Sequence, residues 1–241
     1  MRLALGLALL LVPACDVVPG GPRAVRDAEV ASSEFPKADR PVAPIIASRW
    51  STEEARDRVS EADSVMDVAG ITQGMTVADI GAGEGYYTVR LASRVGASGR
   101  VVGQDIFPKV RDKLSTRILR ENLDNVSVKL GEPNDPKLPA NSFDRIFLVH
   151  MYHEVSDPFE FLWRLRPSLR VGGRVIVVDA NRMPNDHGTP PSLLDCEMKA
   201  VGYRRVDYHD MPKAGGFLAA YEASGKRPQP SAIKPCSLPE S

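Results

Sequence analysis

Short apolar runs alternate with amphipathic segments from residue 76 to residue 180, and this alternation constrains the fold more than any other feature of the sequence. The runs have the length and composition of buried strands, whereas most segments between them carry apolar residues at helical spacing. Strands that alternate with helices form right-handed βαβ units and therefore a parallel sheet. The predicted parallel strands are Val77–Ile80, Arg100–Gln104, Val126–Leu130, Phe143–Met151 and Arg174–Ala180.

The end of the chain departs from this alternation. Tyr203–His209 and Phe217–Glu222 predict two further strands, but the residues between them, DMPKAGG, are too few for a helix. Two strands joined by so short a connection pair in antiparallel orientation. We therefore predict an α/β fold with a doubly wound, seven-stranded, Rossmann-like sheet that is mostly parallel and contains a C-terminal antiparallel strand pair.

Residues 1–15 have the parts of a secretory signal peptide. Arg2 provides a positive charge, residues 3–12 are apolar, and small residues lead to Cys15. The approach to Cys15 resembles a bacterial lipoprotein processing site. We therefore expect an exported protein that is either periplasmic or anchored to the membrane through a lipid on Cys15. A cytoplasmic protein with a misassigned start codon is the alternative.

Composition divides the rest of the chain into three parts. Residues 16–47 are rich in Pro, Ala and Val without sustained periodicity and are expected to form a disordered tether. Residues 48–223 are expected to form one globular domain, and the Pro-rich residues 224–241 a disordered tail. Cys196 and Cys236 could pair in an oxidising compartment or remain thiols, and the sequence leaves both outcomes open.

The charges of the chain balance, with 31 basic and 31 acidic side chains in 241 residues. A nucleic-acid-binding surface would normally show a basic excess, so no nucleic-acid partner is expected. No apolar run reaches the ~18 residues that a membrane-spanning helix needs. A small molecule is the expected partner, and the membrane would be reached only through the N-terminal anchor.

Three glycines at alternate positions follow the first predicted strand, in the pattern D-x-G-x-G-x-G. Ligands of open α/β sheets bind at the carboxyl ends of the strands, where this loop is expected to lie. Gly81 and Gly83 would let the backbone approach a ligand closely, and Gly85 opens the next helix. A dinucleotide-binding loop would place its third glycine one position later, where Tyr86 stands.

Asp105 ends the second predicted strand, beside the glycine-rich loop. A carboxylate at this place can accept hydrogen bonds from two hydroxyl groups at once, as a ribose would offer them. The loop and Asp105 together predict a site for a nucleoside-containing ligand.

The D-x-G-x-G-x-G motif, Asp105, the order of the elements and the final strand pair together resemble the class I S-adenosylmethionine-dependent methyltransferases. The resemblance covers about residues 50–223 and implies S-adenosyl-L-methionine as the cofactor. It implies the glycines around the methionine part of that cofactor, Asp105 at its ribose, and Glu132 at its adenine amino group, with Asp135 as a second choice. The implied cofactor-binding residues are Asp79, Gly81, Gly83, Gly85, Asp105, Glu132 and His150.

The sequence HMYHE ends the fourth predicted strand and supplies the catalytic candidates. His153 could act as a general base if the acceptor must lose a proton, and Glu154 could orient it. The alternative is that His150 only lines the pocket and that His153 and Glu154 only fix the loop. The three residues match no zinc-binding spacing, so no metal is expected. The polar segment 181–192 could be a substrate lid carrying His187 or simply a long loop.

The resemblance implies methyl transfer to an unidentified small-molecule acceptor. The Asn-Pro-Pro-aromatic signature of methyltransferases that act on amino groups of bases and glutamine is absent from the sequence. Aminopropyl transfer on the same fold is one alternative. The other is an exported, non-catalytic ligand-binding module that retains the methyltransferase fold, because S-adenosylmethionine is made in the cytosol.

Overall fold

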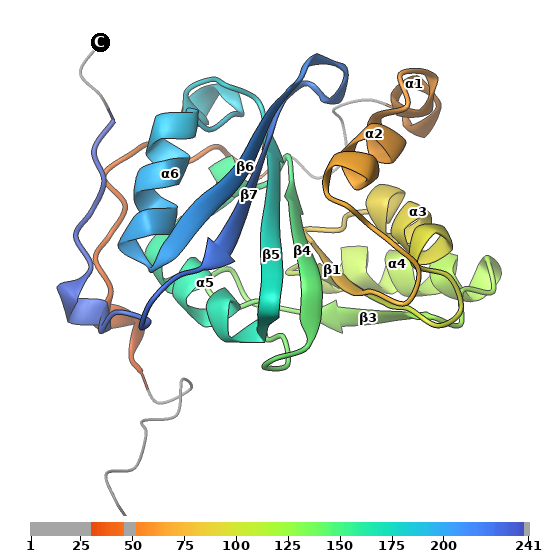
Figure 1. The fold of residues 1–241 in the computed structure, drawn as a ribbon, viewed down its shortest axis with the longest axis horizontal. Coiled ribbons are helices and arrows are strands. Elements are labelled where there is room, and N and C mark those ends of the chain that lie inside the picture. Colours follow the sequence, from red (N-terminus) through yellow and green to blue (C-terminus); the bar gives the residue numbers. More distant parts are fainter. Residues whose placement is uncertain (1–29, 46–51, 239–241) are drawn as a thin grey trace, which may run out of the picture. The chain divides into compact units, whose positions relative to one another are not determined.

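One seven-stranded sheet organises the computed structural model, which describes residues 30–45 and 52–238 (Figure 1). The strand order is β3-β2-β1-β4-β5-β7-β6. The first five strands of this order are parallel, and β7 pairs antiparallel with both β5 and β6. The predicted fold class is therefore confirmed. The strands are β1 (Thr76–Ile80), β2 (Arg100–Asp105), β3 (Val126–Leu130), β4 (Phe143–Val149), β5 (Leu169–Asp179), β6 (Tyr203–Met211) and β7 (Gly216–Ala223).

Helices cover both faces of this sheet (Figure 1). One face carries α2, α3 and α4, with the short α1 beside α2, and the other carries α5 and α6. This division follows from right-handed crossovers that run outward in both directions from β1 and β4. The helices are α1 (Glu53–Arg58), α2 (Glu61–Val68), α3 (Tyr86–Val95), α4 (Pro108–Arg120), α5 (Pro158–Leu165) and α6 (Pro191–Ala200).

The central strands are buried on both faces, which explains their nearly continuous apolar sequence. Val77 and Ala78 of β1 have no exposed surface, and the same holds for Ile176 and Val178 of β5. Because helices cover both faces of the sheet, ligands can bind at the polar ends of the strands. The carboxyl edge of β1, β2, β4 and β5 therefore positions the candidate site.

Residues 31–45 pack on the domain, which differs from the disordered tether expected for residues 16–47. Phe35 is buried with its ring edge-on to Trp163 of α5. The Arg40 guanidinium forms a fully buried ion pair with Glu197 of α6, with Nε and Oε1 2.8 Å apart. Residues 1–29 and 46–51, which include Cys15, lie outside the described residues.

Residues 224–238 also pack on the domain, instead of forming the disordered tail expected for residues 224–241. Trp163 Nε1 donates to the Pro228 carbonyl, and the Arg227 guanidinium lies 3.5 Å from the centre of the Trp163 indole. Ile233 is buried. The proline-rich composition concealed these contacts because each depends on a partner far away along the chain.

A disulfide joins Cys196 of α6 to Cys236 of this C-terminal segment, with an S–S distance of 2.08 Å. The sequence had left open whether these cysteines pair. Cys196 is exposed, whereas Cys236 is buried against the domain. Among the described residues, no helix has both the length and the apolarity needed to cross a membrane.

Replacing Cys196 by serine should lower the free energy of unfolding by about 2–4 kcal/mol, because the cross-link closes a loop of 40 residues and so restricts the unfolded chain. Urea denaturation would measure the change. Cys196 is the better position because its side chain is exposed, so the substitution removes the bond with little loss of packing. Dithiothreitol should lower the stability of the unmodified protein to the same level and leave that of Cys196→Ser unchanged. If the two proteins are equally stable without reductant, the expectation is contradicted.

Candidate functional site

A cavity of about 660 Å³ opens at the carboxyl edge of β1, β2 and β4. Its wall combines backbone of the glycine-rich loop with acidic side chains and apolar side chains. Two segments from elsewhere in the sequence complete the wall, namely residues 42–45 and the first turn of α1. This volume lies in the usual range for small-molecule sites, ~300–1,000 Å³.

The glycine-rich loop uses its glycines for two different purposes. All three have positive φ, with values of 68° at Gly81, 56° at Gly83 and 91° at Gly85. A Cβ on Gly83 would meet no atom within 4 Å, and Gly81 and Gly83 both line the cavity. A Cβ on Gly85 would come within 2.5 Å of Leu114 in α4, and Gly85 does not line the cavity. Gly85 therefore serves helix packing, which differs from the cofactor contact that the resemblance implied.

Asp105 lies where the sequence placed it, at the end of β2 and in the cavity wall. Its carboxylate accepts hydrogen bonds from the backbone N–H of Gly83 at 3.1 Å and of Phe107 at 3.0 Å. A carboxylate offers about four lone-pair positions, so two such contacts leave capacity for ligand hydroxyls. The same two contacts fix the side chain beside the glycine-rich loop.

Asp79, the next-to-last residue of β1, lines the cavity and is almost fully buried. Burial raises the pKa of this carboxyl to about 6, and the hydrogen bond from Thr88 Oγ1 at 2.6 Å opposes the rise. Thr88 belongs to α3, so this contact ties the end of β1 to the helix that follows the loop. Asp79 therefore helps to fix the glycine-rich loop between β1 and α3.

The β3–β4 connection brings Glu132 and Pro133 to the cavity wall, whereas Asp135 does not line it. Asp135 instead accepts a hydrogen bond from the backbone N–H of Lys137 at 2.7 Å. Phe107 also lines the cavity and is 40% exposed, beside Ile106. Sequence reasoning missed this apolar wall, whose signal was its position directly after Asp105.

The three polar residues of HMYHE lie in different surroundings. His150 and Glu154 line the cavity, whereas His153 is fully buried and does not. His153 Nδ1 lies 3.0 Å and 3.1 Å from the two carboxylate oxygens of Asp179, which ends β5 and is also fully buried. We expected both His153 and Glu154 at the pocket, but only Glu154 lies there. Asp179 was not identified from the sequence, because only the fold brings it to His153.

Glu61 of α2 contacts three side chains that line the cavity. It accepts hydrogen bonds from Arg56 Nε at 2.9 Å and Tyr87 OH at 3.0 Å, and its Oε1 lies 3.8 Å from His150 Nε2. Burial raises the pKa of the Glu61 carboxyl, but the neighbouring His150 and Arg56 outweigh burial and bring it to about 2. The ionised carboxylate therefore holds Arg56 over the ring of Tyr86, with the guanidinium carbon 3.7 Å from the ring centre.

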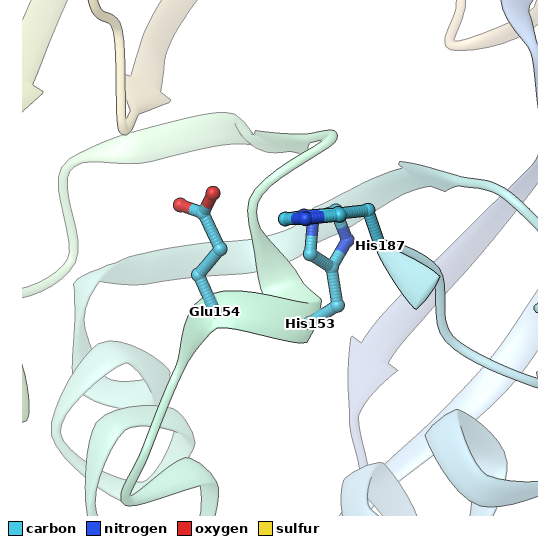
Figure 2. Close-up of side chains that lie close together, drawn as sticks. All are labelled: His153, Glu154 and His187. Carbon is cyan, nitrogen blue, oxygen red and sulfur yellow. The ribbon is translucent and has the colours of Figure 1, made fainter. Parts of the chain in front are cut away.

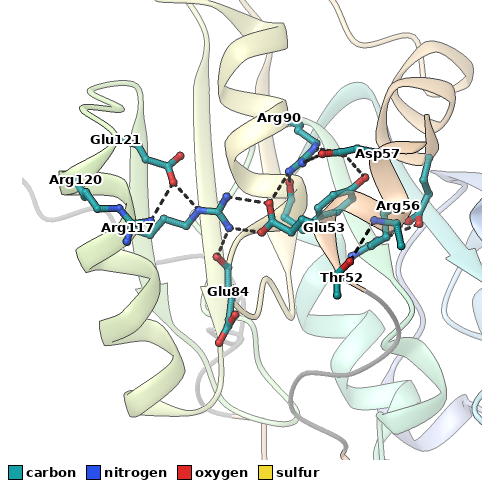
Figure 3. Close-up of polar contacts among 12 residues, drawn as sticks. Thr52, Glu53, Arg56, Asp57, Glu84, Arg90, Arg117, Arg120 and Glu121 are labelled. Carbon is teal, nitrogen blue, oxygen red and sulfur yellow. Dashed lines mark hydrogen bonds and ion pairs between the residues drawn. The ribbon is translucent and has the colours of Figure 1, made fainter. Parts of the chain in front are cut away.

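A second set of ion pairs holds α1 over the same region (Figure 3). Glu53 of α1 accepts hydrogen bonds from Arg117 Nη2 of α4 at 3.1 Å and from Arg90 Nη1 of α3 at 3.3 Å. Arg117 Nη1 also donates to the carbonyl of Glu84 in the glycine-rich loop at 2.9 Å. Because Glu53 and Arg56 both line the cavity, these contacts fix one side of its opening.

Comparison with known proteins finds similarities to methyltransferases. Residues 78–177 match the family model described as "Methyltransferase domain". The chain is 27% identical over 196 residues to the ubiquinone/menaquinone biosynthesis C-methyltransferase UbiE of Idiomarina loihiensis, which covers 65% of this chain and 76% of that protein. It is 26% identical over 174 residues to the arsenite methyltransferase of Halobacterium salinarum, covering 64% of this chain and 44% of that protein.

Solved structures share the fold. A SAM-dependent methyltransferase from Aquifex aeolicus superposes with a TM-score of 0.61 at 22% identity, covering 71% of this chain and 97% of that chain. The [4+2]-cyclase SpnF superposes with a TM-score of 0.59 at 17% identity, covering 80% of this chain and 90% of that chain. The family model and the named relatives thus place the similarities of this chain among methyltransferases.

The two roles of the glycines predict different losses on substitution. Gly85→Ala should lower the free energy of unfolding by about 3 kcal/mol, because the new methyl group would overlap Leu114 and the backbone has positive φ. Gly83→Ala should cost only about 1 kcal/mol, since its methyl group would enter open space. Urea denaturation of the two variants tests this, and equal losses would contradict the assignment.

Proposed function

We propose that this chain, whose residues 78–177 match a methyltransferase-domain family model, transfers the methyl group of S-adenosyl-L-methionine to a small-molecule acceptor. The observation that carries the proposal is the cavity at the carboxyl edge of the sheet. Asp105 and the open space beside Gly83 lie on one side of this cavity. His150 and Glu154, from the segment that follows β4, lie on another. One cavity thus offers places for a nucleoside and for a second molecule.

The residues present fit this cofactor. The space beside Gly83 would accept the methionine part against bare backbone, with Gly81 next to it. Asp105 would accept hydrogen bonds from the ribose hydroxyls, and Glu132 from the adenine amino group. Phe107 supplies an apolar surface for the purine.

When bound, the cofactor supplies a methyl group on a sulfonium, which passes to the acceptor by in-line displacement and leaves the demethylated product. The chain contributes position and shelter from water, since α1 and residues 42–45 border the cavity. Glu154 lines the wall and would accept a proton from an acceptor that must lose one. His150 contacts the same space, whereas buried His153 would act as a positioning residue behind Glu154.

The relatives do not select an acceptor, because their names refer to quinone biosynthesis and to arsenite. A cyclase shares this fold, so the fold alone does not determine the reaction or the acceptor. The acceptor depends on the residues of the site. The comparisons give no support to the alternative of a non-catalytic binding module.

We also propose that the protein is exported. The signal-like N-terminus and the Cys196–Cys236 disulfide support this, because disulfides persist in oxidising compartments. Fractionation of cells that express the untagged full chain should recover it outside the cytoplasm, with Cys196 and Cys236 resistant to alkylation. Cytoplasmic recovery with both thiols alkylated would contradict export.

Asp105→Asn should weaken binding of S-adenosylmethionine and of its demethylated product about 100-fold, because the charge-assisted hydrogen bonds to the ribose are lost. Isothermal titration of the full chain would measure both affinities. Asp124→Asn is the matched control, since Asp124 is exposed and away from the cavity, and it should bind like the unmodified protein. Failure of the unmodified protein to bind either compound at millimolar concentration would contradict the methyltransferase proposal.

The acceptor class can be tested with cofactor labelled on its methyl group. Incubation with a cell extract should move the label into compounds that pass a membrane of small pore size, and Asp105→Asn should prevent this. Label that enters only protein or nucleic acid would contradict a small-molecule acceptor.

A further inference from the structure

Three side chains with metal-binding atoms lie close together (Figure 2), and one of them, Glu154, lines the cavity. His153 and Glu154 belong to one short 3₁₀ turn, Tyr152–Glu154, after β4. His187 approaches from the loop after β5, where it follows the turn Pro184–Asp186. One ligand atom from each of the three residues lies within 4.8 Å of the others.

Asp179 fixes the orientation of His153. Both oxygens of its buried carboxylate lie within 3.1 Å of His153 Nδ1. A carboxylate accepts the hydrogen bond, so it selects the imidazole form with the proton on Nδ1, in which Nε2 is the metal-binding atom. Histidine ligands of metals usually have such a carboxylate or carbonyl partner on the other ring nitrogen.

The same carboxylate also anchors the loop that carries His187. Thr189 Oγ1 donates to Asp179 Oδ2 at 2.7 Å, and the Thr189 backbone N–H donates to the Ala180 carbonyl at 2.8 Å. Between these residues, a Cβ on Gly188 would come within 2.6 Å of the Ala180 carbonyl oxygen, so the loop lies directly against the strand end. Asp179 thus contacts His153 directly and holds the loop of His187 through Thr189. The two imidazole rings lie edge to face, with their centres 5.5 Å apart.

Two imidazoles and one carboxylate form a ligand set that suits zinc and its transition-metal neighbours rather than magnesium or calcium, which prefer oxygen ligands. Sets of this kind leave at least one coordination position for water or substrate. Glu154 and His187 are partly exposed, and Glu154 lines the cavity, which gives a metal ion a path to the site.

We propose that His153, Glu154 and His187 bind one divalent transition-metal ion of the zinc type, with Asp179 holding the histidines in place. This revises the expectation of no metal, which considered His150 with His153 and Glu154. Resting on the proposed function, a metal ion here would also bind an oxygen or sulfur atom of the acceptor and favour its deprotonated form, and Glu154 would then act as a metal ligand instead of as the proton acceptor. Metal binding itself does not depend on the methyltransferase activity.

Titration of the full chain with zinc chloride, in the absence of any cofactor, tests the site directly. The protein should be purified without a polyhistidine tag, and one ion should bind per chain. His187→Asn should weaken this binding at least 10-fold, because it removes a ligand while asparagine tolerates the positive φ of 50° at this position. Asp179→Asn should weaken it about 10- to 100-fold by loosening both histidines.

The chain has four histidines, so the other two provide matched controls. His209→Asn should bind zinc like the unmodified protein, because His209 lies on β6 in an exposed pair with Asp207. His150→Asn should do the same, and it tests the set considered from the sequence. Zinc binding should also raise the Tm of the unmodified protein and of both controls.

Three outcomes would overturn the proposal. The first is no zinc binding at about 0.1 mM, a concentration well above the Kd of typical protein zinc sites. The others are unchanged binding in His187→Asn, or a loss confined to His209→Asn or His150→Asn. Circular dichroism of each variant shows that it has folded. Since zinc and S-adenosylmethionine are titrated separately, failure of one proposal leaves the result for the other visible.

Discussion

Three buried carboxylates at the carboxyl edge of the sheet organise the loops around the candidate site. Asp105 and Asp179 end β2 and β5, Asp79 is the next-to-last residue of β1, and each is at most 7% exposed. A buried carboxylate without hydrogen bonds would be strongly unfavourable, so the chain must bring donors to each of them. Those donors come from the start of α3, from the glycine-rich loop and from the loop after β5. The loops that satisfy these acids are therefore the loops that form or border the cavity.

Two sides of the cavity differ in origin: one, the fixed side, comes from neighbouring elements of the chain, and the other, the assembled side, from segments far apart in the sequence. The fixed side is formed by β1, β2 and the glycine-rich loop, which all belong to one βαβ unit of the chain. The assembled side depends on distant segments: Glu61 links α2 to Tyr87, Glu53 links α1 to α3 and α4, and Arg40 pairs with Glu197 just before residues 42–45 reach the wall. This arrangement suits a site in which one ligand class is determined by the fold and the second by variable surroundings.

The sequence predicted what depends on local pattern. Apolar runs located the strands, the short connection before β7 predicted its antiparallel pairing, and the motif rule for strand ends placed Gly83 and Asp105 beside one another. It could not predict what depends on long-range packing. The burial of His153 depends on Asp179, and the packing of residues 224–238 depends on Trp163 and Cys196. His187 was noticed only as part of a polar segment, because no spacing motif connects it with His153.

His150 and His187 both adopt left-handed backbone conformations, with φ of 52° and 50°. Such a conformation costs a residue with a side chain on the order of 1 kcal/mol or more relative to glycine. Glycine at either position would therefore relieve backbone strain and delete an imidazole from the neighbourhood of the cavity in the same step. Selection for thermostability alone would favour that exchange, so these two positions are where a gain in stability and a loss of chemical function would be expected to coincide.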